Sequence, residues 1–237
     1  MIQLDGIGKE IIDKESNGTL GPQSQMSFLG YSIILERGAK ALLFFMGIFT
    51  SGVFFVTMSS KKMGEEKMDT IEQFVKNNQK LYIDLIKTIT SIPAPSHKEE
   101  KRVKFLLKYL HQLGYVNAFA DEEKNVIIEL CENGAEDIHL YTAHIDTVFP
   151  DEVEIEVSET EDKLCGPGIG DDTANVAALL MFLTYIKQAG ISTSQNLVVA
   201  LNSCEEGLGN LDGAKALWKR YGNQISQHIS FDGGYQW

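Results

Sequence analysis

Six acidic or imidazole side chains stand in four short motifs, each of which follows an apolar run and precedes glycine or polar residues. They are His144 and Asp146 in HID, Asp171 in GIGDD, Glu205 and Glu206 in CEEG, and Asp232 in FDGG. Open α/β folds place their chemistry at the carboxyl ends of sheet strands, so we expect the four motifs to meet at one edge of a sheet. Imidazole and carboxylate groups gathered there are typical of a two-metal hydrolase, here with one ligand missing.

His144 and Asp146 form the first candidate unit. Alternate residues of an extended chain lie on the same side, so Asp146 can accept a hydrogen bond from one ring nitrogen of His144 and leave the other nitrogen free for a metal. A single histidine at a strand end is more often a structural residue with a satisfied hydrogen bond. Asp171 lies in a glycine-rich turn that enters an expected helix, where the alternative role is that of a helix N-cap.

Glu205 and Glu206 are adjacent carboxylates that follow an expected buried strand. Two like charges repel each other in a low-dielectric setting, and a bound cation removes that cost. One glutamate could then bind a metal while the other accepts a proton from water. The alternative is a solvent-exposed acidic pair. Asp232 follows the last expected strand, and the four motifs together favour a metal site over unrelated structural features.

The elements that must position these motifs alternate along the chain after Met68. Hydrophobic residues at helical spacing predict a helix over 71–89, and Ser96 with Glu99 forms a capping-box pattern for a second helix that ends at Gly114. Further helices are expected over 173–188 and 211–221, and strands over 125–131, 138–143, 153–157, 196–202 and 228–231. This order predicts an α/β fold, a three-layer sandwich with a mixed, partly parallel sheet.

Composition narrows the classes of partner. The chain has 237 residues and a formal net charge of -12, and no cluster of basic residues offers a site for nucleic acid. Its three cysteines lack C-x-x-C spacing and cannot all pair, which fits a reducing compartment better than a secreted disulfide framework. These features favour a cytoplasmic protein.

The first 67 residues form a segment of different character. Residues 41–58 carry no charge and reach the minimum of roughly 18 residues for a membrane helix, but threonine, serine and glycine dilute them. A membrane anchor and an interfacial or buried helix are two interpretations. A third is a misassigned start, because residues 64–67 need purine-rich codons that resemble a bacterial ribosome-binding site before Met68; the natural start is then Met68 or Met63. The alternative for residues 64–67 is a plain charged linker.

The four motifs together resemble a known family. HIDTVFP, GPGIGDDTAN, NSCEEGLGN and SFDGG, in this order, are similar to the catalytic domain of the M20 family of zinc metallopeptidases, over residues 68–237. The resemblance implies two zinc ions per complete active site. It also implies that His144 binds one zinc, Asp146 orients His144, Asp171 bridges both zincs, Glu205 is the general base, Glu206 binds the second zinc and Asp232 binds the first.

The resemblance further implies hydrolysis of amide bonds in short peptides. Aspartate at position 232 is more similar to the aminopeptidase and dipeptidase branches than to the carboxypeptidase and deacylase branches, and Thr173 stands where many members have lysine, as in some peptidase-T-like relatives. An N-acyl amino acid deacylase is the alternative enzyme. A non-catalytic remnant that binds one metal or a full-length partner is the alternative of a different class.

One departure from the family concerns the end of the sequence. Members of the family continue into a lid domain, which is often used for dimerisation, and then return to the catalytic domain with a histidine that completes the second zinc site. The sequence stops at Trp237, and His228 comes too early in the motif order to take that role. We therefore expect an incomplete catalytic domain, and a homodimer only where a lid domain is present.

Overall fold

The computed structural model describes residues 32–34, 71–131, 135–161, 163–193 and 195–233. The possible membrane span 41–58 and both candidate start residues, Met63 and Met68, lie outside these ranges. Among the helices that are described, none has the length and apolar character that crossing a membrane requires.

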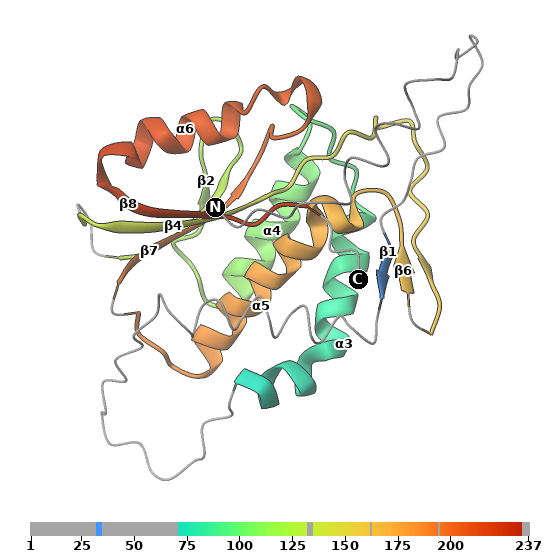
Figure 1. Ribbon diagram of the computed structural model, residues 1–237, viewed down its shortest axis with the longest axis horizontal. Helices are drawn as coiled ribbons and strands as arrows, with labels where there is room; N and C mark the ends of the chain where they lie inside the picture. Colours follow the sequence, from blue (N-terminus) through green and yellow to red (C-terminus); the bar gives the residue numbers. More distant parts are fainter. Residues whose placement is uncertain (1–31, 35–70, 132–134, 162, 194, 234–237) are drawn as a thin grey trace, which may run out of the picture.

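A five-stranded mixed sheet lies at the centre of the fold (Figure 1). Its strands stand in the order β2 (Phe119–Ala120), β3 (Val126–Leu130), β7 (Asn196–Asn202), β4 (Ile138–His144) and β8 (Ile225–Ser230). β3 is antiparallel to β7, whereas β4 lies between β7 and β8 and runs parallel to both. The carboxyl ends of β4, β7 and β8 therefore meet at one edge, and each of them leads into a candidate motif.

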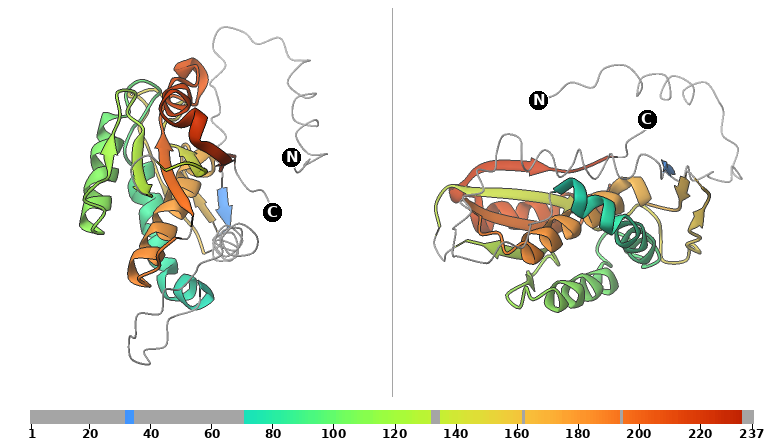
Figure 2. Two further views of the ribbon diagram at one scale, coloured as in Figure 1. Left: turned by 90° about the vertical axis from the view of Figure 1, so that its left-hand side faces the viewer. Right: turned by 90° about the horizontal axis from the view of Figure 1, so that it is seen from below.

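Helices cover both faces of this sheet and make a three-layer sandwich (Figures 1 and 2). α3 (Ile71–Thr90), α4 (Glu100–Gln112) and α5 (Ala174–Gln188) lie on one face, and α6 (Asp212–Tyr221) lies on the other. Alternating residues of β7 separate the two cores: Val199 packs with α3 and α5, while Val198 packs with α6. α5 buries side chains on nearly all sides, as expected for a helix enclosed by other elements.

A second, small sheet stands beside the first one. It consists of β1 (Ser32–Ile34), β6 (Lys163–Cys165) and β5 (Ser158–Glu159), all antiparallel. Short helical turns occupy Ile169–Thr173, Gly207–Gly209 and Gly222–Gln224.

The structure confirms the predicted fold class and corrects one strand. Residues 153–157 alternate between half-buried apolar and exposed acidic side chains, the pattern that predicted a strand. In the described part of the chain they pair with no strand, and the regular structure begins only at β5. Alternating burial arises wherever an extended segment lies along a surface, so the pattern alone does not establish strand pairing.

Candidate metal centre

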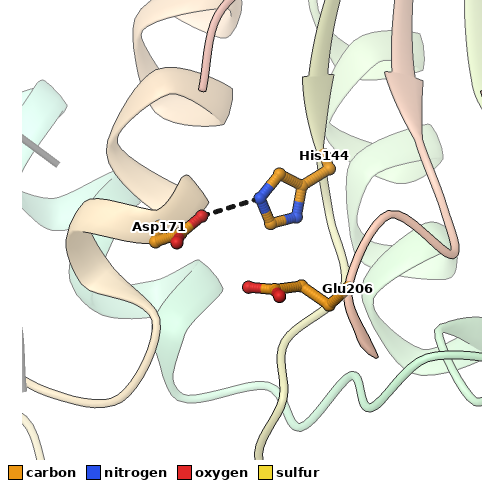
Figure 3. Close-up of side chains that lie close together, drawn as sticks. All are labelled: His144, Asp171 and Glu206. Atoms are coloured by element: carbon orange, nitrogen blue, oxygen red, sulfur yellow. Dashed lines mark hydrogen bonds and ion pairs between the residues drawn. The ribbon is translucent and has the colours of Figure 1, made fainter. Parts of the chain in front are cut away.

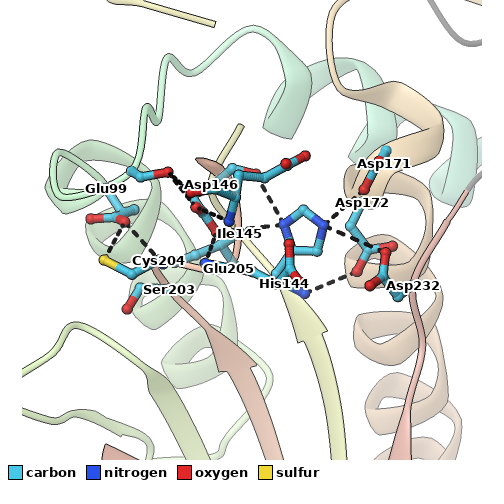
Figure 4. Close-up of polar contacts among 12 residues, drawn as sticks. Glu99, His144, Ile145, Asp146, Asp171, Asp172, Ser203, Cys204, Glu205 and Asp232 are labelled. Carbon is cyan, nitrogen blue, oxygen red and sulfur yellow. Dashed lines mark hydrogen bonds and ion pairs between the residues drawn. The ribbon is translucent and has the colours of Figure 1, made fainter. Parts of the chain in front are cut away.

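All four motifs meet at the edge of the sheet where β4, β7 and β8 end (Figure 4). His144 is the last residue of β4 and is 2% exposed, and the motif's Asp146 is completely buried. Glu205 and Glu206 follow β7 and are half-buried, whereas Asp232 follows β8 and is exposed.

Asp171 reaches this edge from the other side, on the turn Ile169–Thr173 that precedes α5 (Figure 3). Gly168, just before this turn, has φ 68°, and a Cβ there would lie 2.7 Å from Cγ2 of Thr147, which follows the HID motif. Glycine therefore serves two purposes at this position: it allows the left-handed backbone and it lets the two motifs approach each other.

The imidazole of His144 presents its two nitrogens to different groups. Nε2 lies 2.8 Å from Oδ1 of Asp171 and 3.8 Å from Oδ1 of Asp232. Nδ1 lies 3.1 Å from the main-chain oxygen of Asp146 and 3.5 Å from its carboxylate. One ring nitrogen is thus engaged by Asp146, mainly through its main-chain oxygen, and the other faces the remaining acidic residues.

Two overlapping groups of side chains have the composition of a metal site. Ligand atoms of His144, Asp171 and Glu206 all lie within 4.8 Å of one another (Figure 3). The same is true of His144, Asp172 and Asp232. The sequence grouped Asp232 with Asp171 instead. Imidazole nitrogen and carboxylate oxygen are ligands that zinc accepts, so the donor atoms present fit that ion.

Asp146 connects three loops at this edge. Its carboxylate accepts hydrogen bonds from the main-chain nitrogens of Glu205 at 3.0 Å and Glu206 at 2.9 Å. The Ser96 hydroxyl lies 2.7 Å from the same carboxylate and 2.9 Å from the main-chain oxygen of Glu206. These contacts correct the predicted capping box: α4 has Glu99 as its N-cap, without a side-chain cap bond, and Ser96 serves the site instead.

Asp172 and Asn175 are site residues that the sequence reasoning missed. The fully buried carboxylate of Asp172 accepts hydrogen bonds from the main-chain nitrogen of His144 at 2.9 Å and from Nδ2 of Asn175 at 2.5 Å. Asp172 follows Asp171 across a cis peptide bond. The sequence signal for them was a second aspartate beside Asp171 and an asparagine three residues after it. An aspartate and an asparagine at this spacing can contact each other at the start of a helix.

The carboxylates and the imidazole shift one another's pKa values. Burial alone lowers the pKa of His144, but its bonds to Asp146 and Asp171 outweigh burial and raise the pKa to about 11. Burial, followed by repulsion from Asp171, raises the pKa of Glu206 to about 7. Burial also raises the pKa of Glu205. Without a cation, the cluster therefore favours bound protons, as expected where negative charges are crowded.

We expect the metal-free protein to lose stability as the pH rises from about 4.5 towards 7. The pKa of Glu206 is raised from 4.5 to about 7 in the folded chain, so the folded state binds this proton more tightly than the unfolded state. That advantage is complete below pH 4.5 and is lost as the pH passes 7. At pH 8 and in the presence of a chelator, Glu206→Gln should therefore have a higher midpoint temperature of unfolding than the unchanged chain. Each kcal/mol gained in the free energy of unfolding raises this midpoint by about 2–4 °C.

The exposed Glu122 provides the matched control for this prediction. Glu122→Gln should leave the difference between pH 5 and pH 8 as it is in the unchanged chain. An unaltered pH dependence in Glu206→Gln would show that Glu206 is an ordinary solvated carboxylate.

A comparison with models of known protein families gives a match to part of the chain. Residues 140–235 match the model of Peptidase family M20/M25/M40. Curated protein sequences gave no match to the chain.

Several solved structures share the fold. Aminopeptidase PepT from Bacillus cereus is 25% identical with a TM-score of 0.54, over 66% of this chain and 44% of its own. A tripeptidase from Staphylococcus aureus is 20% identical with a TM-score of 0.52, over 65% of this chain and 43% of its own. The dipeptidase Dug1p from Saccharomyces cerevisiae is 16% identical with a TM-score of 0.51, over 68% of this chain and 40% of its own. The chain thus spans less than half the length of each of these three proteins.

Proposed function

We propose, from the match of residues 140–235 to the model of Peptidase family M20/M25/M40, that the chain forms the metal-binding part of a zinc-dependent enzyme that hydrolyses amide bonds in short peptides. We propose an aminopeptidase or dipeptidase in particular. The observation that carries the proposal is the convergence of His144, Asp171 and Glu206 within 4.8 Å at the sheet edge. The likeness to aminopeptidase PepT, at 25% identity, supports the finer assignment.

Two zinc ions are the cofactors that we propose for the complete site. His144 would hold one ion together with Asp171 and Asp232, and Glu206 would hold the other together with Asp171. When bound, zinc supplies Lewis acidity, which polarises a carbonyl group and makes a water molecule more acidic. Asp172 lies in the same group as Asp232, and its hydrogen bond to the main chain of His144 fixes the end of β4.

Glu205 is the residue that we propose as the general base. The main-chain nitrogen of Glu205 donates a hydrogen bond to the carboxylate of Asp146, and this bond fixes the start of the loop that carries the Glu205 side chain. The carboxylate is half-buried, and burial raises its pKa, so it binds a proton more readily than a solvated glutamate. It would accept a proton from the attacking water and return it to the nitrogen of the leaving amine. Glu205 lies outside both groups of possible metal ligands, which leaves its carboxylate available.

Hydrolysis assays with matched substrates test this function. We expect the zinc-loaded protein to cleave tripeptides or dipeptides with a free amino group faster than the same compounds acetylated at that group. A chelator should abolish the cleavage, and added zinc should restore it. Preferential cleavage of the acetylated compounds would indicate an N-acyl amino acid deacylase instead. Stable zinc binding without cleavage of either substrate class would indicate a non-catalytic metal-binding protein.

A further inference from the structure

Two charged residues at the start of α4 are buried close to the candidate metal centre, and neither belongs to a group of possible metal ligands. Glu99 is completely buried and Arg102 is 1% exposed. Charged side chains are almost never buried to this degree unless their hydrogen bonds are satisfied. They are three residues apart at the beginning of one helix, a spacing that places neighbouring side chains on the same face. We call Glu99 and Arg102 the buried pair.

Arg102 binds the loop that carries His144 and Asp146. Its Nη1 donates a hydrogen bond of 2.7 Å to the main-chain oxygen of Ile145, the residue between them. Its Nε and Nη2 donate to the main-chain oxygen of Ile92, at 3.2 Å and 2.7 Å, in the segment that follows α3. Burial lowers the pKa of Arg102 to about 10, so the guanidinium stays charged at neutral pH. The arginine thus joins the end of α3 to the middle of the HID motif.

Glu99 binds the loop that carries Glu205 and Glu206. Its Oε1 accepts a hydrogen bond of 3.2 Å from the main-chain nitrogen of Cys204 and lies 3.3 Å from the sulfur of that residue. Cys204 has φ 54°, a left-handed conformation that is unfavourable for any residue except glycine and persists only where its surroundings hold it. Lys124 contacts the other carboxylate oxygen of Glu99 at 3.2 Å.

The two loops are also bound to each other, through Asp146 and the main-chain nitrogens of Glu205 and Glu206. The contacts therefore form a closed circuit from α4 to the HID loop, from there to the CEE loop, and back to α4. Figure 4 shows two of these links, from Asp146 to the CEE loop and from Cys204 to Glu99. We propose that the buried pair is a positioning device that sets the distance between Asp146 and Glu205 from one rigid helix turn. Its link to catalysis rests on the function proposed above, whereas its effect on the loops does not.

Amide hydrogen exchange of the metal-free full chain tests the effect on the loops. Arg102→Met and Glu99→Met remove the polar groups and keep long side chains. Arg102→Lys and Glu99→Gln each retain one donor or acceptor. We expect exchange at Ile145, Cys204, Glu205 and Glu206 to become about tenfold faster in the two methionine variants, measured relative to the amides inside β7, and to recover in part in the conservative variants. The exposed residues Lys104 and Glu122 supply the controls Lys104→Met and Glu122→Met, which should leave these ratios unchanged.

Titration with Co²⁺, followed by visible absorption, tests the link to the metal centre in the same variants. Loss of a residue that orients metal ligands typically weakens binding about 10–100-fold, and we expect this range for Arg102→Met with a changed absorption spectrum. If a methionine variant does not fold, the measurement is made on the conservative variant at the same position, which should fold.

The outcomes separate this proposal from the proposed function. Equal acceleration of exchange in the loops and in β7 would mean that the buried pair only stabilises the fold, and would overturn the positioning role. Unchanged loop exchange in all four variants would overturn it as well. Failure of the unchanged chain to bind Co²⁺ would contradict the metal-dependent function, while the exchange results still decide the role of the buried pair.

Discussion

Glu205→Gln is expected to keep zinc and lose peptide hydrolysis, whereas Glu206→Gln is expected to lose zinc. Glutamine has the size of glutamate but cannot accept the proton from water, and removal of a general base typically costs about 10²–10⁴ in rate. The main-chain nitrogens of both residues remain bonded to Asp146 after either change, so the loop keeps its path. Zinc content by elemental analysis and cleavage of a short peptide, measured on the same preparations, check both halves.

The comparison is sharp because the two residues are neighbours of the same type, and each is the control for the other. Of these two glutamates, Glu206 belongs to a group of possible metal ligands among the described residues, and Glu205 does not. If Glu205→Gln lost zinc while Glu206→Gln kept it, the two roles would be exchanged. If both variants kept near-normal cleavage, the general-base mechanism would be wrong. The zinc contents alone already distinguish the two assignments.

His144→Ala should have the largest effect on metal binding, because His144 belongs to both groups of possible ligands. Loss of residues that merely orient ligands costs about 10–100-fold in affinity, so the loss of this ligand should exceed that range. Isothermal titration with zinc gives the affinity directly. Circular dichroism of the same samples shows whether the fold is retained without the imidazole.

His228 offers a matched control for this change. It lies on β8, which neighbours β4, and its Nε2 is 3.0 Å from the hydroxyl of Thr142. It belongs to neither group of possible metal ligands. His228→Ala should therefore retain zinc affinity within a factor of about two, and an equal loss in both variants would show that the imidazole of His144 has no special place in the site.

Local patterns predicted the elements of this fold well. Residues 196–202 form a strand with the bounds expected from their apolar run, and the helix over 71–89 extends by a single residue to Thr90. The candidate residues do meet at one edge, because parallel strands carry their following loops to the same side. The bounds of the elements depend on periodicity, which is a property of neighbouring residues, whereas the meeting of the motifs follows from the general rule for parallel strands.

The failures concern relations between distant segments. Ser96 and Glu99 have the spacing of a capping box, but Ser96 contacts Asp146 and Glu99 binds Cys204 instead. Nothing in the local sequence distinguishes these partners from a helix cap. Arg102 lies on the same helix and is buried, where it donates a hydrogen bond to the main-chain oxygen of Ile145. A polar residue's role is set by what the fold brings next to it, and helical periodicity does not contain that information.

The order of strands in the sheet also determines when the metal centre can exist. β4 lies between β7 and β8, and both of these strands come later in the chain. During synthesis, His144 must therefore wait for both neighbouring strands before Glu206 and Asp232 come near it. Pairing between distant segments is slow, because the chain pays loop-closure entropy before it gains the contacts. We therefore expect a metal to bind these residues only after the sheet has assembled, because the ligand atoms do not meet before then.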